Sequence, residues 1–138
     1  MAQSNRDRIN AGFEILADAL NRFLTRVVHI DNSSWIDILE FTDSQRSGSR
    51  GRQDYSAEDP QCSLRFITEG TTHKFRPGWR PLSEKLTRSE EALASELRET
   101  RNLWAHNAKF TDDDAYRALD TMCRLATAVK DTTAAEKL

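Results

Sequence analysis

The stretch LSEKLTRSEEALASELRETRNLWAH, residues 82–106, shows the clearest helical pattern of the chain. At about 100° per residue, its large apolar side chains fall within an arc of about 60°, together with one threonine. These residues are Leu82, Leu86, Leu93, Leu97, Thr100 and Trp104. The pattern predicts a helix from about Leu82 to Ala105, with one face in the core.

Apolar spacing and capping residues predict further helices on both sides of this stretch. A first helix is expected from about Asn5 to His29, and a last helix after the cap and acidic turn at 111–114. The short apolar piece 35–39 is consistent with a short helix or with a strand. Asp59-Pro60 is typical of a helix start. Four or five helices predict an all-α, antiparallel four- to five-helix bundle.

The chain has 138 residues, the size of one compact domain. We expect this domain to span residues 5–131. Residues 42–58 lack an apolar pattern and are longer than an ordinary connection, which indicates a flexible insertion. The last residues, 132–138, are interpreted as a polar tail.

Composition excludes several classes of protein. Lys and Arg number 20 and Asp and Glu 22, so the chain is not a basic nucleic-acid coat protein, although a local basic patch is compatible with this balance. No apolar run approaches the roughly 20 residues that span a bilayer, so no membrane association is expected. Only two cysteines are present, which favours a cytoplasmic protein without a disulfide framework.

A polar cluster marks the end of the predicted helix at 82–105. On a helical wheel, Glu99, Asn102 and His106 share a face roughly opposite the apolar stripe, and Arg101 lies at the edge of that stripe. Such a face is either solvated or covered by a second copy of the chain. In a two-fold dimer, Arg101 and His106 of both copies would converge in one polar cleft, where imidazole and guanidinium suit phosphodiester chemistry.

The run Arg-Asn-Leu-Trp-Ala-His at 101–106 resembles the HEPN superfamily, which is marked by an R-x(4–6)-H motif. The residues of this run, together with Tyr-Arg-Ala-Leu-Asp at 116–120, are similar to those of the subfamily named after a eukaryotic mRNA-surveillance endonuclease. In bacteria, such domains commonly lie at the N-terminus of larger defence-related or ATPase proteins. The resemblance extends over roughly residues 91–129, and the segment 42–55 departs from it.

The resemblance implies a helical homodimer that cleaves RNA without a metal or cofactor, in phage defence or RNA surveillance. Arg101 and His106 would be the catalytic pair, with Asn102 and Glu99 in support. The 2′-hydroxyl would attack the adjacent phosphate, and the products would carry a 2′,3′-cyclic phosphate and a 5′-hydroxyl. The alternative is a non-catalytic domain that dimerises or binds RNA or a partner, followed by further domains.

Other residues are weaker candidates for RNA binding or for a metal site. Cations alternate with aromatic residues at 73–80, so Lys74, Arg76 and Arg80 are candidate RNA contacts, as is Arg98. A packing role for the aromatic residues is the simpler interpretation. No close pair of histidine and cysteine exists, so no metal site is expected. The three acids at 112–114 suit a helix start better than a magnesium site.

Overall fold

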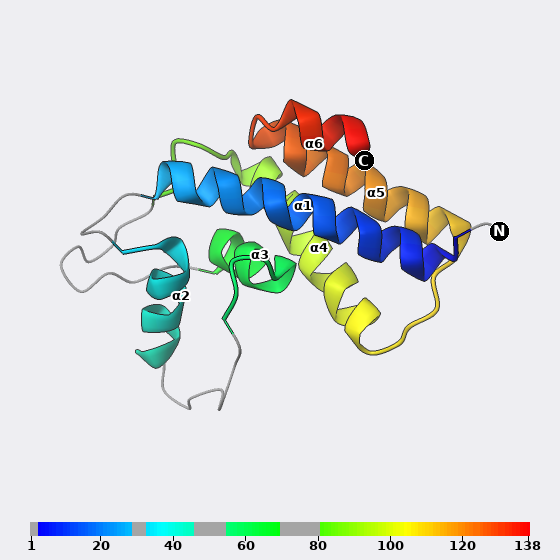
Figure 1. Cartoon of the computed structure of the whole chain (residues 1–138), viewed down its shortest axis with the longest axis horizontal. Coiled ribbons are helices and arrows are strands. Elements are labelled where there is room, and N and C mark those ends of the chain that lie inside the picture. The colour runs from blue at the N-terminus through cyan, green and yellow to red at the C-terminus, as the bar shows by residue number, and fades with distance from the viewer. Residues whose placement is uncertain (1–2, 29–32, 46–54, 70–80) are drawn as a thin grey trace.

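The computed structural model describes residues 3–28, 33–45, 55–69 and 81–138, and these residues form a bundle of six helices (Figure 1). The helices are α1 (Asn5–Val27), α2 (Trp35–Ser44), α3 (Pro60–Thr68), α4 (Arg88–Ala105), α5 (Asp112–Ala128) and α6 (Thr132–Lys137). The all-α bundle is therefore confirmed. The short piece at 35–39 is part of a helix, and the predicted starts of α3 and α5 are confirmed.

Side-chain caps determine where α4 and α5 begin. The hydroxyl of Thr87 accepts a hydrogen bond from the backbone N–H of Glu90, whose carboxylate accepts one from the backbone N–H of Thr87. This capping box starts α4 at Arg88, six residues later than the apolar spacing predicts. Leu82 and Leu86 are still buried, but they reach the core from the turn before the helix.

Helices α1 and α5 run in the same direction along the bundle (Figure 1). At one end, the side-chain amide of Asn5 donates to the carbonyl of Phe110, and at the other end Arg26 donates to the carbonyl of Val129. Gly12 lets the two helices approach closely. A Cβ atom at this position would lie 2.6 Å from Sδ of Met122 and 2.7 Å from Cδ2 of Leu119.

Helix α4 lies antiparallel to α3, and this pairing brings the end of α4 to the start of α3. Gln61 at the start of α3 contacts Asn102, whereas Thr68 at the end of α3 contacts Arg98. On its other side, α4 packs against α5 through Glu96, which accepts hydrogen bonds from Arg117 and Thr121. The Arg117 hydrogen bond lowers the pKa of Glu96, and Thr121 adds to this effect. The core of the bundle lies between these helices and α1.

The expected polar tail at 132–138 forms α6, which accounts for one helix more than predicted. Asp131 caps it by accepting from the backbone N–H of Ala134. Arg22 of α1 donates to the same carboxylate at 2.8 Å, and Ala134 is buried. The sequence of this segment is polar because six of the seven residues face outward or are only partly covered. The apolar contacts of Ala134, Ala135 and Leu138, together with the cap, dock it.

Of the expected insertion at 42–58, residues 42–44 form the end of α2, and residues 46–54 lie outside the described part. Helix α2 continues to Ser44. The Tyr55 hydroxyl donates to Asp43 at 2.5 Å, and Ala57 packs against the core. Burial first, and then this hydrogen bond, raise the pKa of Tyr55 to about 12.

A buried charge network connects α2, α3 and α4. Arg65 is 4% exposed and donates to Asp43 at 2.6 Å and to Glu69 at 3.0 Å. Glu69 also accepts from Arg98 of α4 at 2.9 Å. Burial alone would lower the pKa of Arg65, but the two carboxylates outweigh it and hold the pKa above its usual value. The network therefore fixes α3 against the helix that ends in the arginine and histidine motif.

Candidate functional site

Helix α4 ends in a tight hydrogen-bonded turn that places His106 at its C-terminal boundary. Asn107 adopts the left-handed conformation with φ of 60°. Its backbone N–H donates to the carbonyl of Trp104 at 3.2 Å, and the N–H of Ala108 donates to Leu103 at 3.0 Å. This pair of bonds is a Schellman motif, in which asparagine is the commonest alternative to glycine. The local sequence thus stops the helix directly after the motif.

The side chains of Glu99, Asn102 and His106 are all exposed, in agreement with the helical wheel. Asn102 is held from outside its own helix, since its side-chain oxygen accepts from Nε2 of Gln61 at 3.3 Å. The imidazole of His106 is open to solvent at the helix end and has no hydrogen-bond partner in the described part of the chain. It is therefore accessible to a ligand.

Arg101 is half-buried and lies against the ring of Trp104. Its Cζ atom is 5.1 Å from the centroid of the ring, a cation–π distance. The structure lays the guanidinium of Arg101, which the helical wheel places at the edge of the apolar stripe, along α4. No carboxylate pairs with it in the described ranges, so its charge is available to an anion.

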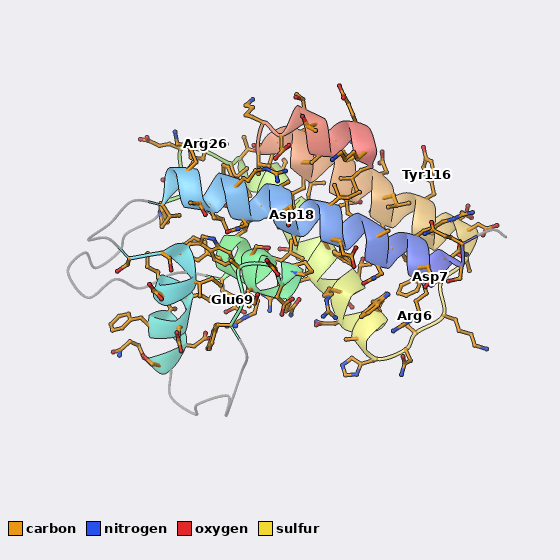
Figure 2. The ribbon with its side chains drawn as sticks, viewed as in Figure 1. Arg6, Asp7, Asp18, Arg26, Glu69 and Tyr116 are labelled. Atoms are coloured by element: carbon orange, nitrogen blue, oxygen red, sulfur yellow. The ribbon has the colours of Figure 1, made fainter. Side chains whose placement is uncertain are left out.

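Arg6, at the start of α1, also belongs to this site, and sequence reasoning missed it. Its Cζ atom lies 4.3 Å from the centroid of the Trp104 ring, and its carbonyl accepts a hydrogen bond from Nε1 of Trp104 at 3.2 Å. Figure 2 shows Arg6 pointing from the start of α1 toward the end of α4. No local pattern signals this contact, because the two residues are 98 positions apart.

Gln61 is a second residue that the sequence did not indicate. It lies in the first turn of α3, directly after Pro60, and reaches the exposed side of α4 at Asn102. Its Oε1 atom is buried and has no hydrogen-bond partner in the described part of the chain. Gln61 therefore connects the polar face of α4 to the bundle.

The remaining candidates for RNA binding are not brought to this site. Arg98 pairs with Glu69 at 2.9 Å and donates to the hydroxyl of Thr68, so its guanidinium has a structural role between α3 and α4. The candidates Lys74, Arg76 and Arg80 lie outside the described residues. Arg101 and Arg6 both contact Trp104, and neither pairs with a carboxylate in the described ranges.

The cysteines have the packing roles that the sequence suggests. Burial raises the pKa of the Cys62 thiol, which stays protonated in the core. Cys123 is half-buried and approaches the carbonyl of Ala135 in α6. Within the described ranges, no group of three or more histidine, cysteine, aspartate or glutamate side chains is arranged to hold a metal ion. None of the described helices has the length and apolar composition needed to cross a bilayer.

An exposed apolar side chain lies beside the polar motif. Leu103 is 46% exposed and lines a groove of about 170 Å³ between α4 and the start of α5, together with Phe110 and Ala118. Tyr116, on α5, is 75% exposed. Solvent-facing apolar residues of this size are compatible with a surface that is covered by a partner.

A helical bundle with an arginine and a histidine five positions apart at a helix end is the arrangement typical of a HEPN domain. A family model described as Swt1-like HEPN matches residues 11–130, most of the chain. The chain therefore belongs to the Swt1-like HEPN family, which confirms the resemblance seen in the residues. No curated protein and no solved structure gave a significant match.

Proposed function

We propose that this protein is an endoribonuclease of HEPN type, in which Arg101 and His106 act on one phosphate of RNA. Membership of the family is consistent with a role in RNA cleavage or nucleic-acid binding. The observation that carries the proposal is that the end of α4 holds an exposed imidazole and a guanidinium that no carboxylate of the described residues neutralises. Both groups are accessible from solvent, and neither is engaged by a carboxylate of the described chain.

In the proposed reaction, the 2′-hydroxyl attacks the adjacent phosphorus and the bond to the 5′-oxygen breaks. A base removes the proton of the 2′-hydroxyl, and an acid gives a proton to the leaving 5′-oxygen. His106 provides one of these transfers, which contributes a rate factor of about 10²–10⁴. Arg101 stabilises the charge that develops on the phosphoryl oxygens. The products are a 2′,3′-cyclic phosphate and a 5′-hydroxyl.

A homodimer would complete the site, because in-line displacement puts the attacking 2′-oxygen and the leaving 5′-oxygen on opposite sides of the phosphorus, where one imidazole does not reach both. We place its interface on the exposed face of α4, where Leu103 is the apolar group beside Asn102 and His106. Two-fold symmetry then brings His106 of the partner subunit to the same cleft. Dimerisation is measured by sedimentation equilibrium, and Leu103→Glu is expected to shift the protein to monomer and to remove cleavage.

The experiment that tests this function measures cleavage of a labelled single-stranded RNA in the presence of excess EDTA. We expect the native protein to cleave, and His106→Ala and Arg101→Ala to lose at least about 10²-fold in rate. Lys137→Ala is the control, since Lys137 is an exposed cation on α6 and does not line the groove beside Leu103. Circular dichroism verifies that each variant is folded.

Cleavage that EDTA abolishes, or that survives in His106→Ala, would contradict the proposal. A protein that binds the RNA without cleaving it would support the alternative function, a non-catalytic domain that binds RNA or a partner. In that case neither the native protein nor His106→Ala cleaves the RNA, and Arg101→Ala weakens RNA binding. Either function would serve phage defence or RNA surveillance as one part of a larger system.

A further inference from the structure

Arg6 and Arg101 approach the same aromatic ring from different helices. Their Cζ atoms lie 4.3 Å and 5.1 Å from the centroid of Trp104, so they cannot be farther apart than the sum of these distances. Trp104 is fixed in place because its Nε1–H donates to the carbonyl of Arg6. The fold therefore brings two guanidinium groups to one ring, although they are 95 positions apart in the sequence.

This pair of cations is not neutralised within the described ranges. Neither Arg6 nor Arg101 forms an ion pair there, and Asp112, at the start of α5, accepts from Asn5 instead. Nη1 of Arg6 is buried without a hydrogen-bond partner in the same part of the chain. Two like charges that share one ring repel each other, and an anion between or beside them would relieve that repulsion.

The geometry of stacking leaves donors of both groups available, apart from the buried Nη1 of Arg6. A guanidinium that lies over a ring uses its face, whereas its N–H groups point outward in its own plane. These N–H groups match the oxygens of a phosphate and can bind two of them at once. Successive phosphates of one strand are joined through a single ribose, so two guanidinium groups that contact the same ring can each reach one of them.

We infer that Arg6 binds a second phosphate, next to the one on which Arg101 and His106 act. This inference rests on the proposed function and deepens it. The substrate is then a single strand with at least two consecutive phosphates, rather than a dinucleotide. Arg6 lies in the first turn of α1, before the residues that the family model matches.

The experiment compares cleavage of a uridine dinucleotide, which holds one internucleotide phosphate, with cleavage of a uridine trinucleotide, which holds two. We expect the native protein to favour the trinucleotide by about tenfold in kcat/KM, the effect of one charge-assisted contact. Arg6→Ala is expected to lose this preference, so that its kcat/KM for the trinucleotide falls toward its kcat/KM for the dinucleotide. Arg8→Ala is the matched control, because Arg8 is an exposed cation two residues further along α1.

A second measurement uses binding of a fluorescein-labelled oligouridylate by the His106→Ala protein, in which cleavage is removed. Adding Arg6→Ala is expected to weaken binding about tenfold and to reduce the slope of log Kd against log salt by about 1, because one phosphate contact is lost. Arg6→Lys keeps the charge and should restore most of the slope. A merely structural role for Arg6 would leave the slope unchanged.

The outcomes separate this inference from the proposed function. If the native protein cleaves RNA and Arg6→Ala retains both the trinucleotide preference and the salt slope, the inference is overturned and the function stands. If the native protein neither cleaves nor binds any of these RNAs, the function and the inference both fall. Loss of the preference in Arg6→Ala but not in Arg8→Ala supports the second phosphate subsite.

Discussion

The guanidinium of Arg101 lies over the ring of Trp104, one helical turn further along α4, with 5.1 Å between Cζ and the ring centroid. This contact places the charge of Arg101 on the ring rather than letting it move freely in solvent. A side chain that is ordered before the substrate binds loses less entropy when it meets a phosphate. Trp104 therefore acts as a positioning residue for the proposed site.

Replacing Trp104 tests this positioning role. We expect Trp104→Leu to lower kcat/KM for RNA by about three- to thirtyfold, the range of a cation–π contact between exposed and desolvated limits. Trp104→Phe keeps a ring and should lose less, although it removes the hydrogen bond to the carbonyl of Arg6. Urea unfolding measures how much of each effect is lost stability. Equal activity of the two variants would show that the ring does not position Arg101.

The buried charge network predicts a large loss of stability when Arg65 is removed. Arg65→Met leaves Asp43 and Glu69 close together without their shared cation, and we expect unfolding to become easier by about 3–5 kcal/mol. The matched control is Arg124→Ala, which removes an exposed pair with Asp120 and should leave the urea midpoint unchanged. A similar midpoint for both variants would contradict a structural role of the network.

Lys130 adopts the left-handed conformation at the end of α5, with φ of 65°. Its N–H donates to the carbonyl of Thr127 and the next N–H donates to Ala126, the same pair of bonds that ends α4. Glycine adopts this conformation without steric cost. We therefore expect Lys130→Gly to stabilise the protein by about 0.5–1 kcal/mol, measured by thermal unfolding. A lower midpoint temperature for the variant would contradict the left-handed conformation of this residue.

The contact between Arg22 and Asp131 predicts how acid affects the C-terminal helix. Burial would raise the pKa of Asp131, but the backbone N–H of Ala134 and the guanidinium of Arg22 outweigh it and lower the pKa. The pKa of Asp131 is lower in the folded protein than in the unfolded protein, where it lies near 3.8. The ionised carboxylate therefore stabilises the fold above this pH, and the stabilisation is lost as the pH falls through the folded pKa. Hydrogen exchange should therefore show α6 opening below about pH 4.

The variant Asp131→Asn provides the control for this acid effect. It removes the titrating group, so the protection of α6 should be weaker at neutral pH and should change less between about pH 5 and about pH 3. If the native protein and this variant lose protection of α6 in parallel over that range, Asp131 is not the group responsible.

The helices could be predicted from local patterns, whereas the contacts that build the site could not. The apolar stripe and the cap at Thr111 predict the helices on either side of His106, and the six-residue motif indicates Arg101 and His106. Helix α4 begins at Arg88 and not at the predicted Leu82, because Thr87 caps the helix there. Leu82 and Leu86 keep the helical spacing and are buried, but they precede the helix.

Two kinds of information are absent from local sequence. The first is pairing over long separations, as between Gln61 and Asn102 or between Arg6 and Trp104, where no motif links the partners. The second is the docking of a polar segment by a few contacts, which α6 achieves through Asp131 and Ala134. Capping and periodicity describe each helix by itself, so they do not report which helix ends meet.

In the proposed reaction, the nucleophile is the 2′-hydroxyl of the RNA itself. A substrate in which this hydroxyl is blocked therefore tests the reaction. The measurement offers the native protein, in EDTA, a single-stranded RNA and a fully 2′-O-methylated strand of the same sequence, with the product ends identified by mass. We predict that only the unmodified strand is cut and that its fragments end in a 2′,3′-cyclic phosphate and a 5′-hydroxyl. Cleavage of the methylated strand, or fragments with a 5′-phosphate, would contradict the account.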